Sequence, residues 1–390
     1  MIILPQKILK LINDSITFSS ICRTIPFRRV KDGNNSTIYK TYIRTPSLKS
    51  GAPIRMLTCW IVLLFQVFAG SFSTYRLIWA IFFLGGFEHV PVLDMGYVAY
   101  GSFGFGIGAI FLVSIWWKHN EYLAFLNLLV KTPAKNDKGI DDTFSKMIPW
   151  IVPAAYSQCM CNSILFIKRS NGVQYFWGIL NPAWQTDTIF VLSALYEFVT
   201  ALNSWNSALF VFFTYSCYTH YLGVYLKKLG KNQEIRPSSN LQACRACSSS
   251  YRQLQVVDKL YHSCYGAYII PLSNSVLLFL VSWLSFSTFR LSKTGVLTVT
   301  QPSSFIFPLA TFALGIVAFC VNSEGQLLFE GSTNLVTEWR KCRMMKRMRI
   351  VQSCAPLKAH VGSFYFLKKI SPLVYISNTV GLTINMLLTF

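Results

Sequence analysis

The sequence predicts an all-α membrane protein with seven transmembrane helices and a cytoplasmic N-terminus. Hydrophobic residues make up 53% of the 390-residue chain and charged residues only 13%, whereas soluble domains carry about 25% charged residues. Seven apolar stretches are each long enough to cross a hydrocarbon core of about 30 Å. Lys and Arg gather in the segments on one side of these stretches, and the positive-inside rule places that side in the cytoplasm.

The first of these segments, residues 1–55, is polar and basic, and we expect it to contain an interfacial helix at residues 2–12. A second basic segment, residues 324–370, precedes the last span. The segments placed inside hold 10, 5, 7 and 9 Lys or Arg, and the segments placed outside hold five of the chain's 36, if Arg76 at the far end of the first span is counted with them. An odd number of spans then puts the C-terminus outside the cell. The spans are predicted at residues 56–75 with an alternative end at residue 84, and at 97–117, 147–167, 188–225, 261–289, 303–321 and 371–390.

Several spans carry features that predict their packing. In the second span Gly104 and Gly108 form a GxxxG pair, which favours a close helix contact. Pro149 and Pro153 predict a kinked entry to the third span, and Pro271 interrupts the fifth. The fourth span, 38 residues without a proline, would reach nearly 60 Å as a helix, about twice the hydrocarbon core. We expect its Tyr-rich lower end to lie at the interface or under protein.

The last span carries a polar stripe. Asn378, Leu382, Asn385 and Thr389 recur at steps of four, three and four, so they share one face of a helix. Amides and a hydroxyl facing lipid would be costly, so the stripe faces either a partner helix or a water-filled pore. The stripe alone leaves both interpretations open.

The residues around this span resemble a known C-terminal signature, with departures at several positions. Small and aromatic residues in 359–369 lead into a helix that ends in a Phe. The sequence resembles the insect-type gustatory and odorant receptor superfamily, most closely its gustatory branch, as a divergent member. The family motif, Thr-Tyr, five hydrophobic residues, Gln and Phe, corresponds here to Leu382 and Thr383, Ile384–Leu388 with Asn385 intruding, Thr389, and Phe390.

The resemblance implies a taste-type receptor of the plasma membrane that acts as a ligand-gated, non-selective cation channel. Four identical or related subunits would place their last helices around a central axis, and long helices would form a cytoplasmic anchor. The polar stripe would face or border the pore, and the family's constriction maps to Met386. The implied partners are a small-molecule tastant, permeating cations, related subunits and membrane lipid.

The same resemblance implies a ligand site in the outer half of the helix bundle, where several aromatic and polar residues are predicted to lie. Glu197 is the one acidic residue well inside a span, where it costs a few kcal/mol unless it is paired or hydrated. It either contacts the ligand or accepts a hydrogen bond from another helix. The candidate ligand residues are Tyr100, Gln158, Asn162, Tyr196, Glu197 and Trp283.

Other functions have less support. A G-protein-coupled receptor has its N-terminus outside and usually an external disulfide, but the eleven cysteines avoid all three predicted outer loops. Cys244 and Cys247 have zinc spacing without a second pair, so we expect no metal, and we expect no cofactor or enzyme activity. The net charge of +21 follows the membrane topology and does not indicate nucleic-acid binding. A non-conducting or co-receptor relative stays open.

Overall fold

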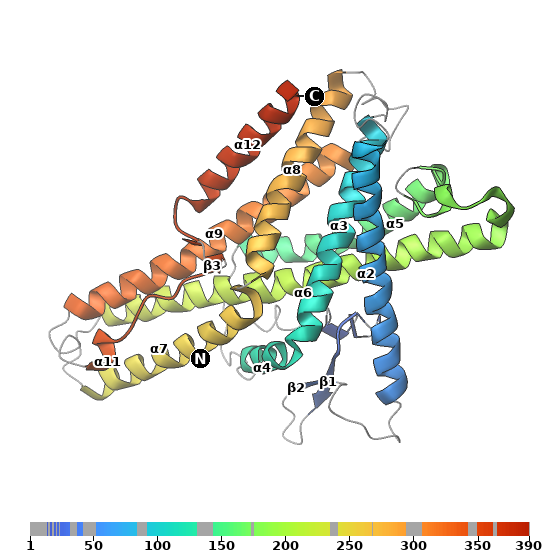
Figure 1. Ribbon diagram of the computed structural model, residues 1–390. Coiled ribbons are helices and arrows are strands. Elements are labelled where there is room, and N and C mark those ends of the chain that lie inside the picture. The colour runs from blue at the N-terminus through green and yellow to red at the C-terminus, as the bar shows by residue number, and fades with distance from the viewer. Residues whose placement is uncertain are drawn as a thin grey trace.

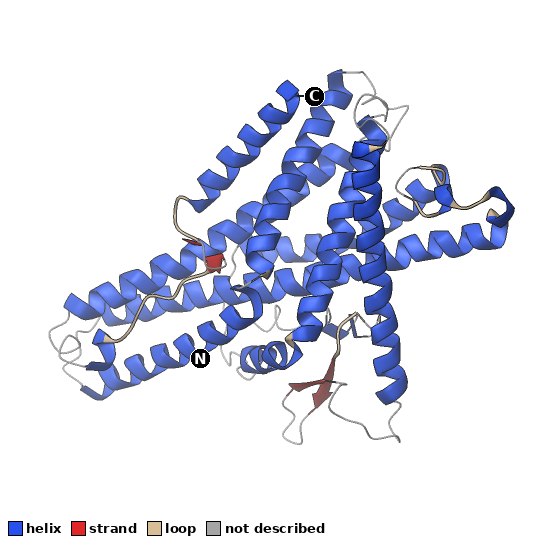
Figure 2. Ribbon diagram, viewed as in Figure 1, coloured by secondary structure: helices blue, strands red, loops and turns tan. Residues whose placement is uncertain are grey.

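The computed structural model describes most of the chain, and the part that it describes is mainly helical (Figures 1 and 2). The described residues are 14, 16–17, 19–20, 22, 24–31, 37–41, 52–83, 92–130, 143–172, 175–234, 241–266, 268–293, 306–341, 349–361 and 365–389. The interfacial helix predicted at residues 2–12 lies outside them.

Each of the seven predicted spans overlaps one long helix. Four of these helices, α2, α3, α8 and α9, are long and apolar enough to cross a membrane, so the prediction of an all-helical, multi-pass membrane protein is confirmed. The seven helices are α2 (Ala52–Phe82), α3 (Val92–Trp117), α5 (Thr143–Lys168), α6 (Asp187–Glu234), α8 (Ile269–Lys293), α9 (Ile306–Lys341) and α12 (Ser371–Thr389).

Two of the helices are much longer than a bilayer requires. The 48 residues of α6 and the 36 of α9 correspond to about 72 Å and 54 Å. They pack against each other along the lower left of Figure 1, with the shorter helix α7 (Leu241–Tyr261) beside them. The sequence predicted the extension of α6, but it placed the end of the α9 span at residue 321, twenty residues before the helix ends.

Aromatic side chains fill the space between these long helices and their neighbours. Tyr218 of α6 stacks on Tyr261 of α7 with 4.3 Å between ring centroids, and both are buried. Tyr215 and Tyr265 belong to the same buried cluster. The tyrosines that the sequence analysis noted at the lower end of α6 are thus covered by protein at positions 215 and 218.

A helix and a strand pair that the sequence analysis did not predict also contribute to this cluster. Helix α4 (His119–Val130) lies in what was expected to be a polar linker, and it buries Tyr122 and Phe125. The N-terminal segment forms an antiparallel pair, β1 (Phe27–Lys31) and β2 (Thr37–Thr41). Tyr39 N–H donates to Asn127 Oδ1 (2.8 Å), and Asn127 Nδ2 donates to Tyr39 O (3.2 Å), which joins β2 to α4.

The start of α8 also differs from the prediction. A π-helical turn, His262–Gly266, follows α7, and α8 begins at Ile269. Pro271 therefore lies in the first turn of α8, where its missing N–H has no helical acceptor, and it does not interrupt the helix. Helix α5 continues through both Pro149 and Pro153.

A short segment connects α9 to α12. It contains α11 (Arg349–Gln352) and the strand pair β3 (His360–Val361) and β4 (Tyr365–Phe366). Leu357 N–H donates to Ser332 Oγ of α9 (3.0 Å), and Leu367 packs closely over Gly325. The chain thus reaches the start of α12 while it is held against the surface of α9.

Asp258 of α7, beside the aromatic cluster, is predicted to make the stability of the fold depend on pH. Burial raises the pKa of its carboxyl group to about 7, although a hydrogen bond from Tyr218 Oη (3.2 Å) opposes the shift. The folded chain therefore keeps a proton that an unfolded Asp releases near pH 4, so the buried carboxyl group lowers stability as pH rises from about 4 to 7.

Asp258→Asn is expected to stabilise the chain at pH 8 by about 1–3 kcal/mol, and by less at pH 5. Thermal unfolding of the detergent-solubilised chain measures the effect. Glu338→Gln, which removes an exposed carboxyl group from α9, serves as the control and should follow the parent chain. Parallel pH profiles for Asp258→Asn and the parent chain would contradict the prediction.

Candidate functional site

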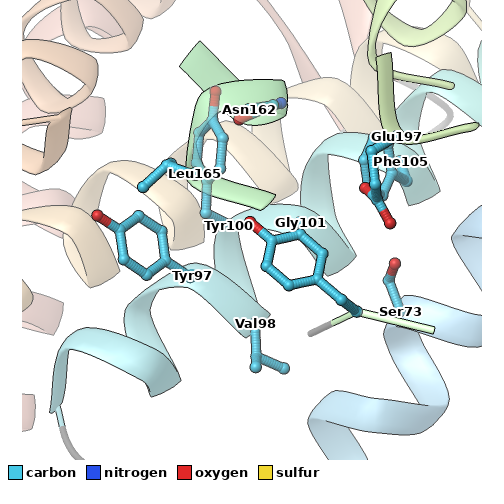
Figure 3. A pocket seen from close by; sticks show the side chains of 10 residues that line it. Ser73, Tyr97, Val98, Tyr100, Gly101, Phe105, Asn162, Leu165 and Glu197 are labelled. Carbon is cyan, nitrogen blue, oxygen red and sulfur yellow. The ribbon is translucent and has the colours of Figure 1, made fainter. Parts of the chain in front are cut away.

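A cavity of about 40 Å³ lies between α2, α3, α5 and α6 (Figure 3). Three of the six candidate ligand residues line it: Tyr100 of α3, Asn162 of α5 and Glu197 of α6. The hydroxyl group of Tyr100 points toward the side chain of Asn162. We call this space the inner cavity.

Glu197 supplies the one carboxyl group among the residues that line the inner cavity. Its side chain is only 7% exposed, and its carboxyl group points toward the hydroxyl group of Ser73 (Figure 3). Within the described part of the chain, no side chain forms a hydrogen bond or ion pair with this carboxyl group. An acid placed in a membrane helix without a partner favours a ligand or water beside it.

The remaining candidate ligand residues lie elsewhere. Tyr196 lines a second cavity, described below, together with Glu197. Gln158 lies one helical turn from Asn162 but lines neither cavity. Trp283 of α8 packs instead against α3 and α12, in a cluster with Met95 and Met386.

Several residues of the inner cavity are not among the six candidate ligand residues named from the sequence, for example Ser73, Gly101 and Tyr175. Gly101 has the weakest sequence signal, because a glycine in an apolar helix usually indicates packing. A Cβ atom at this position would approach only Phe105, at 3.9 Å, so the glycine leaves room in the cavity. Ser73 could have been noticed as a polar residue in the outer half of the first span.

Helix α12 packs on α8 through one side only. Thr383 Oγ1 approaches Ser282 O at 3.4 Å, and Ser282 Oγ donates to Thr379 O at 3.2 Å. Met386 is 8% exposed and is buried in the cluster of Trp283 and Phe286, and Leu382 lies partly buried on the same side. The position that the family signature maps to the constriction therefore faces the helix bundle of its own chain.

The exposed half of α12 divides into two sectors of different chemistry. At 3.6 residues per turn, one sector holds only large apolar side chains. The neighbouring sector holds most of the predicted stripe, with small and polar groups beside Val374 and Leu388. The apolar sector consists of Leu373, Ile376, Val380, Ile384 and Leu387. The polar members of the second sector are Ser377, Asn378, Asn385 and Thr389, together with Gly381.

No metal site is found among the residues that the structure describes, since no three His, Cys, Asp or Glu side chains there lie close enough to hold an ion. The side chain of Cys244, one of the paired cysteines noted in the sequence, lies outside the described set.

Comparison with solved structures identifies the fold. No protein-family model and no curated protein matches the sequence. The chain matches the insect olfactory receptor OR5 from Machilis hrabei in complex with eugenol, with a TM-score of 0.66, 11% identity, and coverage of 98% of this chain and 99% of that chain. A second OR5 structure from the same organism matches with a TM-score of 0.59 and 13% identity, and the match covers 98% of this chain and 97% of that chain. The chain therefore has the fold of an insect olfactory receptor, and the resemblance found in the sequence is confirmed at the level of the fold.

Proposed function

We propose that this chain is a chemosensory receptor of the insect type, a ligand-gated cation channel in which four copies arrange α12 around a central pore. The observation that carries the proposal is the polar sector of α12, which lies on a helix whose other exposed sector is fully apolar. Side chains such as Asn378 and Asn385 are suited to line water, and the apolar sector is suited to lipid. The fold, shared with an olfactory receptor solved with the small molecule eugenol, supports a receptor function.

In the proposed topology all seven long helices cross the plasma membrane. The N-terminus lies in the cytoplasm and the C-terminus outside, as the distribution of Lys and Arg favours. The aromatic cluster around Tyr218 and Tyr261 then lies in the cytoplasm and forms the anchor that holds the subunits together. The inner cavity lies in the outer half of the membrane, within reach of an external tastant.

A second candidate function is that of a non-conducting or co-receptor subunit. The observation that favours it is Asn385, which interrupts the hydrophobic run of the family's terminal motif. A polar side chain there changes the pore lining or a helix contact, and either change could make the chain dependent on a related subunit.

Whole-cell recording of the chain expressed alone tests the proposed function. Sugars, amino acids, bitter compounds and lipids are applied while G-protein signalling is blocked, and at least one class is expected to open a cation current.

Gly101→Leu fills the inner cavity and should abolish the response. Gly315→Leu is the matched control, because a Cβ atom at Gly315 in α9 would have no neighbour within 4 Å. Ligand-evoked currents that survive Gly101→Leu unchanged would exclude the inner cavity.

Met386→Ser is expected to raise the resting conductance. The substitution removes most of a side chain that holds α12 against Trp283 and Phe286, a loss of about 2–4 kcal/mol of packing. A more loosely held α12 opens more often without ligand. Met386→Leu, which keeps the volume, should behave like the parent chain. Unchanged resting current in Met386→Ser, at normal surface expression, would argue against control of the pore by this contact.

A further inference from the structure

A second, larger cavity opens on the outside of the helix bundle between α2 and α6. Its volume is about 240 Å³, just below the range of pockets that hold drug-sized ligands. We call it the outer groove. Apart from Leu192, Ser193 and Glu197, its lining is aromatic. The aromatic lining residues are Phe65, Phe68, Phe166, Phe176, Trp177 and Tyr196.

The mouth and the inner end of the groove differ in chemistry. Phe65 and Phe68 on α2 are about half exposed, and Leu192 on α6 is 58% exposed, all on segments proposed to lie in the membrane. The mouth is therefore apolar and open to lipid. At its buried inner end the groove is lined by Glu197 and Tyr196, and the hydroxyl group of Tyr196 is buried and has no hydrogen-bond partner among the described residues.

We infer that the outer groove binds an organic ammonium ion with an apolar body, taken up from the bilayer. A cation is attracted to aromatic faces, and it would form an ion pair with the carboxylate form of Glu197. Tyr196 Oη could accept a hydrogen bond from the ammonium group. A hydrocarbon tail could fill the same space, but it would leave both polar groups without partners.

Glu197 connects the groove to the inner cavity, because this residue lines both. An ammonium ion in the groove would draw the carboxyl group away from the inner cavity, or would compete there with a second ligand. Uptake from the bilayer and the effect on gating rest on the proposed topology and function, whereas binding in the groove does not require the chain to conduct.

Binding of two matched probes to the purified full chain in lipid nanodiscs tests the inference. The probes are 2-phenylethylammonium and its neutral counterpart 2-phenylethanol, measured by calorimetry. The ammonium ion is expected to bind at least about tenfold more tightly, and Glu197→Gln should remove this difference. Retained binding of the alcohol by Glu197→Gln would show that the variant is folded. Equal affinity of the parent chain for both probes would overturn the inference.

Two further variants locate the site. Leu192→Trp fills the mouth of the groove and should weaken ammonium binding at least about tenfold. The matched control is Leu195→Trp, on a side chain of similar exposure, 55%, that does not line the groove. Gly101→Leu fills the inner cavity and should leave binding unchanged. Loss of binding in Gly101→Leu but not in Leu192→Trp would move the ligand to the inner cavity and refute the groove.

Discussion

Gly108→Val is expected to leave little folded protein. A Cβ atom at Gly108 would lie 2.7 Å from the backbone Cα of Ser204, where α3 and α6 meet. This steric clash can be relieved only if the two helices separate. Their separation would also disturb the hydrogen bond from Gln66 Nε2 to Ser204 Oγ (2.6 Å). We expect a loss of about 3 kcal/mol or more.

The yield of monodisperse protein and its thermal midpoint measure this effect. The other glycine of the predicted pair supplies the control, because a Cβ atom at Gly104 would have no neighbour within 4 Å. Gly104→Val should therefore fold like the parent chain. Similar yields for the two variants would mean that α3 and α6 do not meet at Gly108.

Asn385→Lys is expected to abolish the cation current at normal surface expression. In the proposed tetramer this substitution places four ammonium groups around one narrow pore, and their repulsion of entering cations is strong away from bulk water. Asn385→Gln keeps the amide and should retain current. Whole-cell recording beside surface labelling measures both variants, and an undiminished current in Asn385→Lys would exclude Asn385 from the pore.

The helices could be predicted because their signal is local. An apolar run of about 20 residues forms a helix in a membrane whatever lies beside it. Helix α4 and the strand pair β1–β2 have no such signal, because partners far along the chain stabilise them. Tyr39 is joined to Asn127 by two hydrogen bonds, and the two residues lie 88 positions apart.

The sequence predicted which candidate residues lie at the same level of neighbouring helices, but not the direction in which each side chain faces. Tyr100, Asn162 and Glu197 meet because residues at the same height on neighbouring helices can share a cavity. Trp283 lies at a similar predicted height but faces α12, and Met386 likewise turns toward α8. The direction in which an almost uniformly apolar helix faces depends on packing partners, so it is not readable from the sequence of that helix alone. The aromatic residues of the outer groove gave no signal for the same reason.

Cysteine accessibility along α12 tests the central claim most directly. Asn378→Cys, Gly381→Cys and Asn385→Cys lie in the polar sector, and Ile376→Cys, Val380→Cys and Ile384→Cys lie in the apolar sector. A charged, membrane-impermeant thiol reagent is applied during recording, with the parent chain as the control for the native cysteines. We predict that the reagent blocks current at the three polar-sector positions and leaves the three apolar-sector positions unchanged. Block at the apolar positions, or equal insensitivity of all six in a conducting channel, would contradict a pore lined by this face of α12.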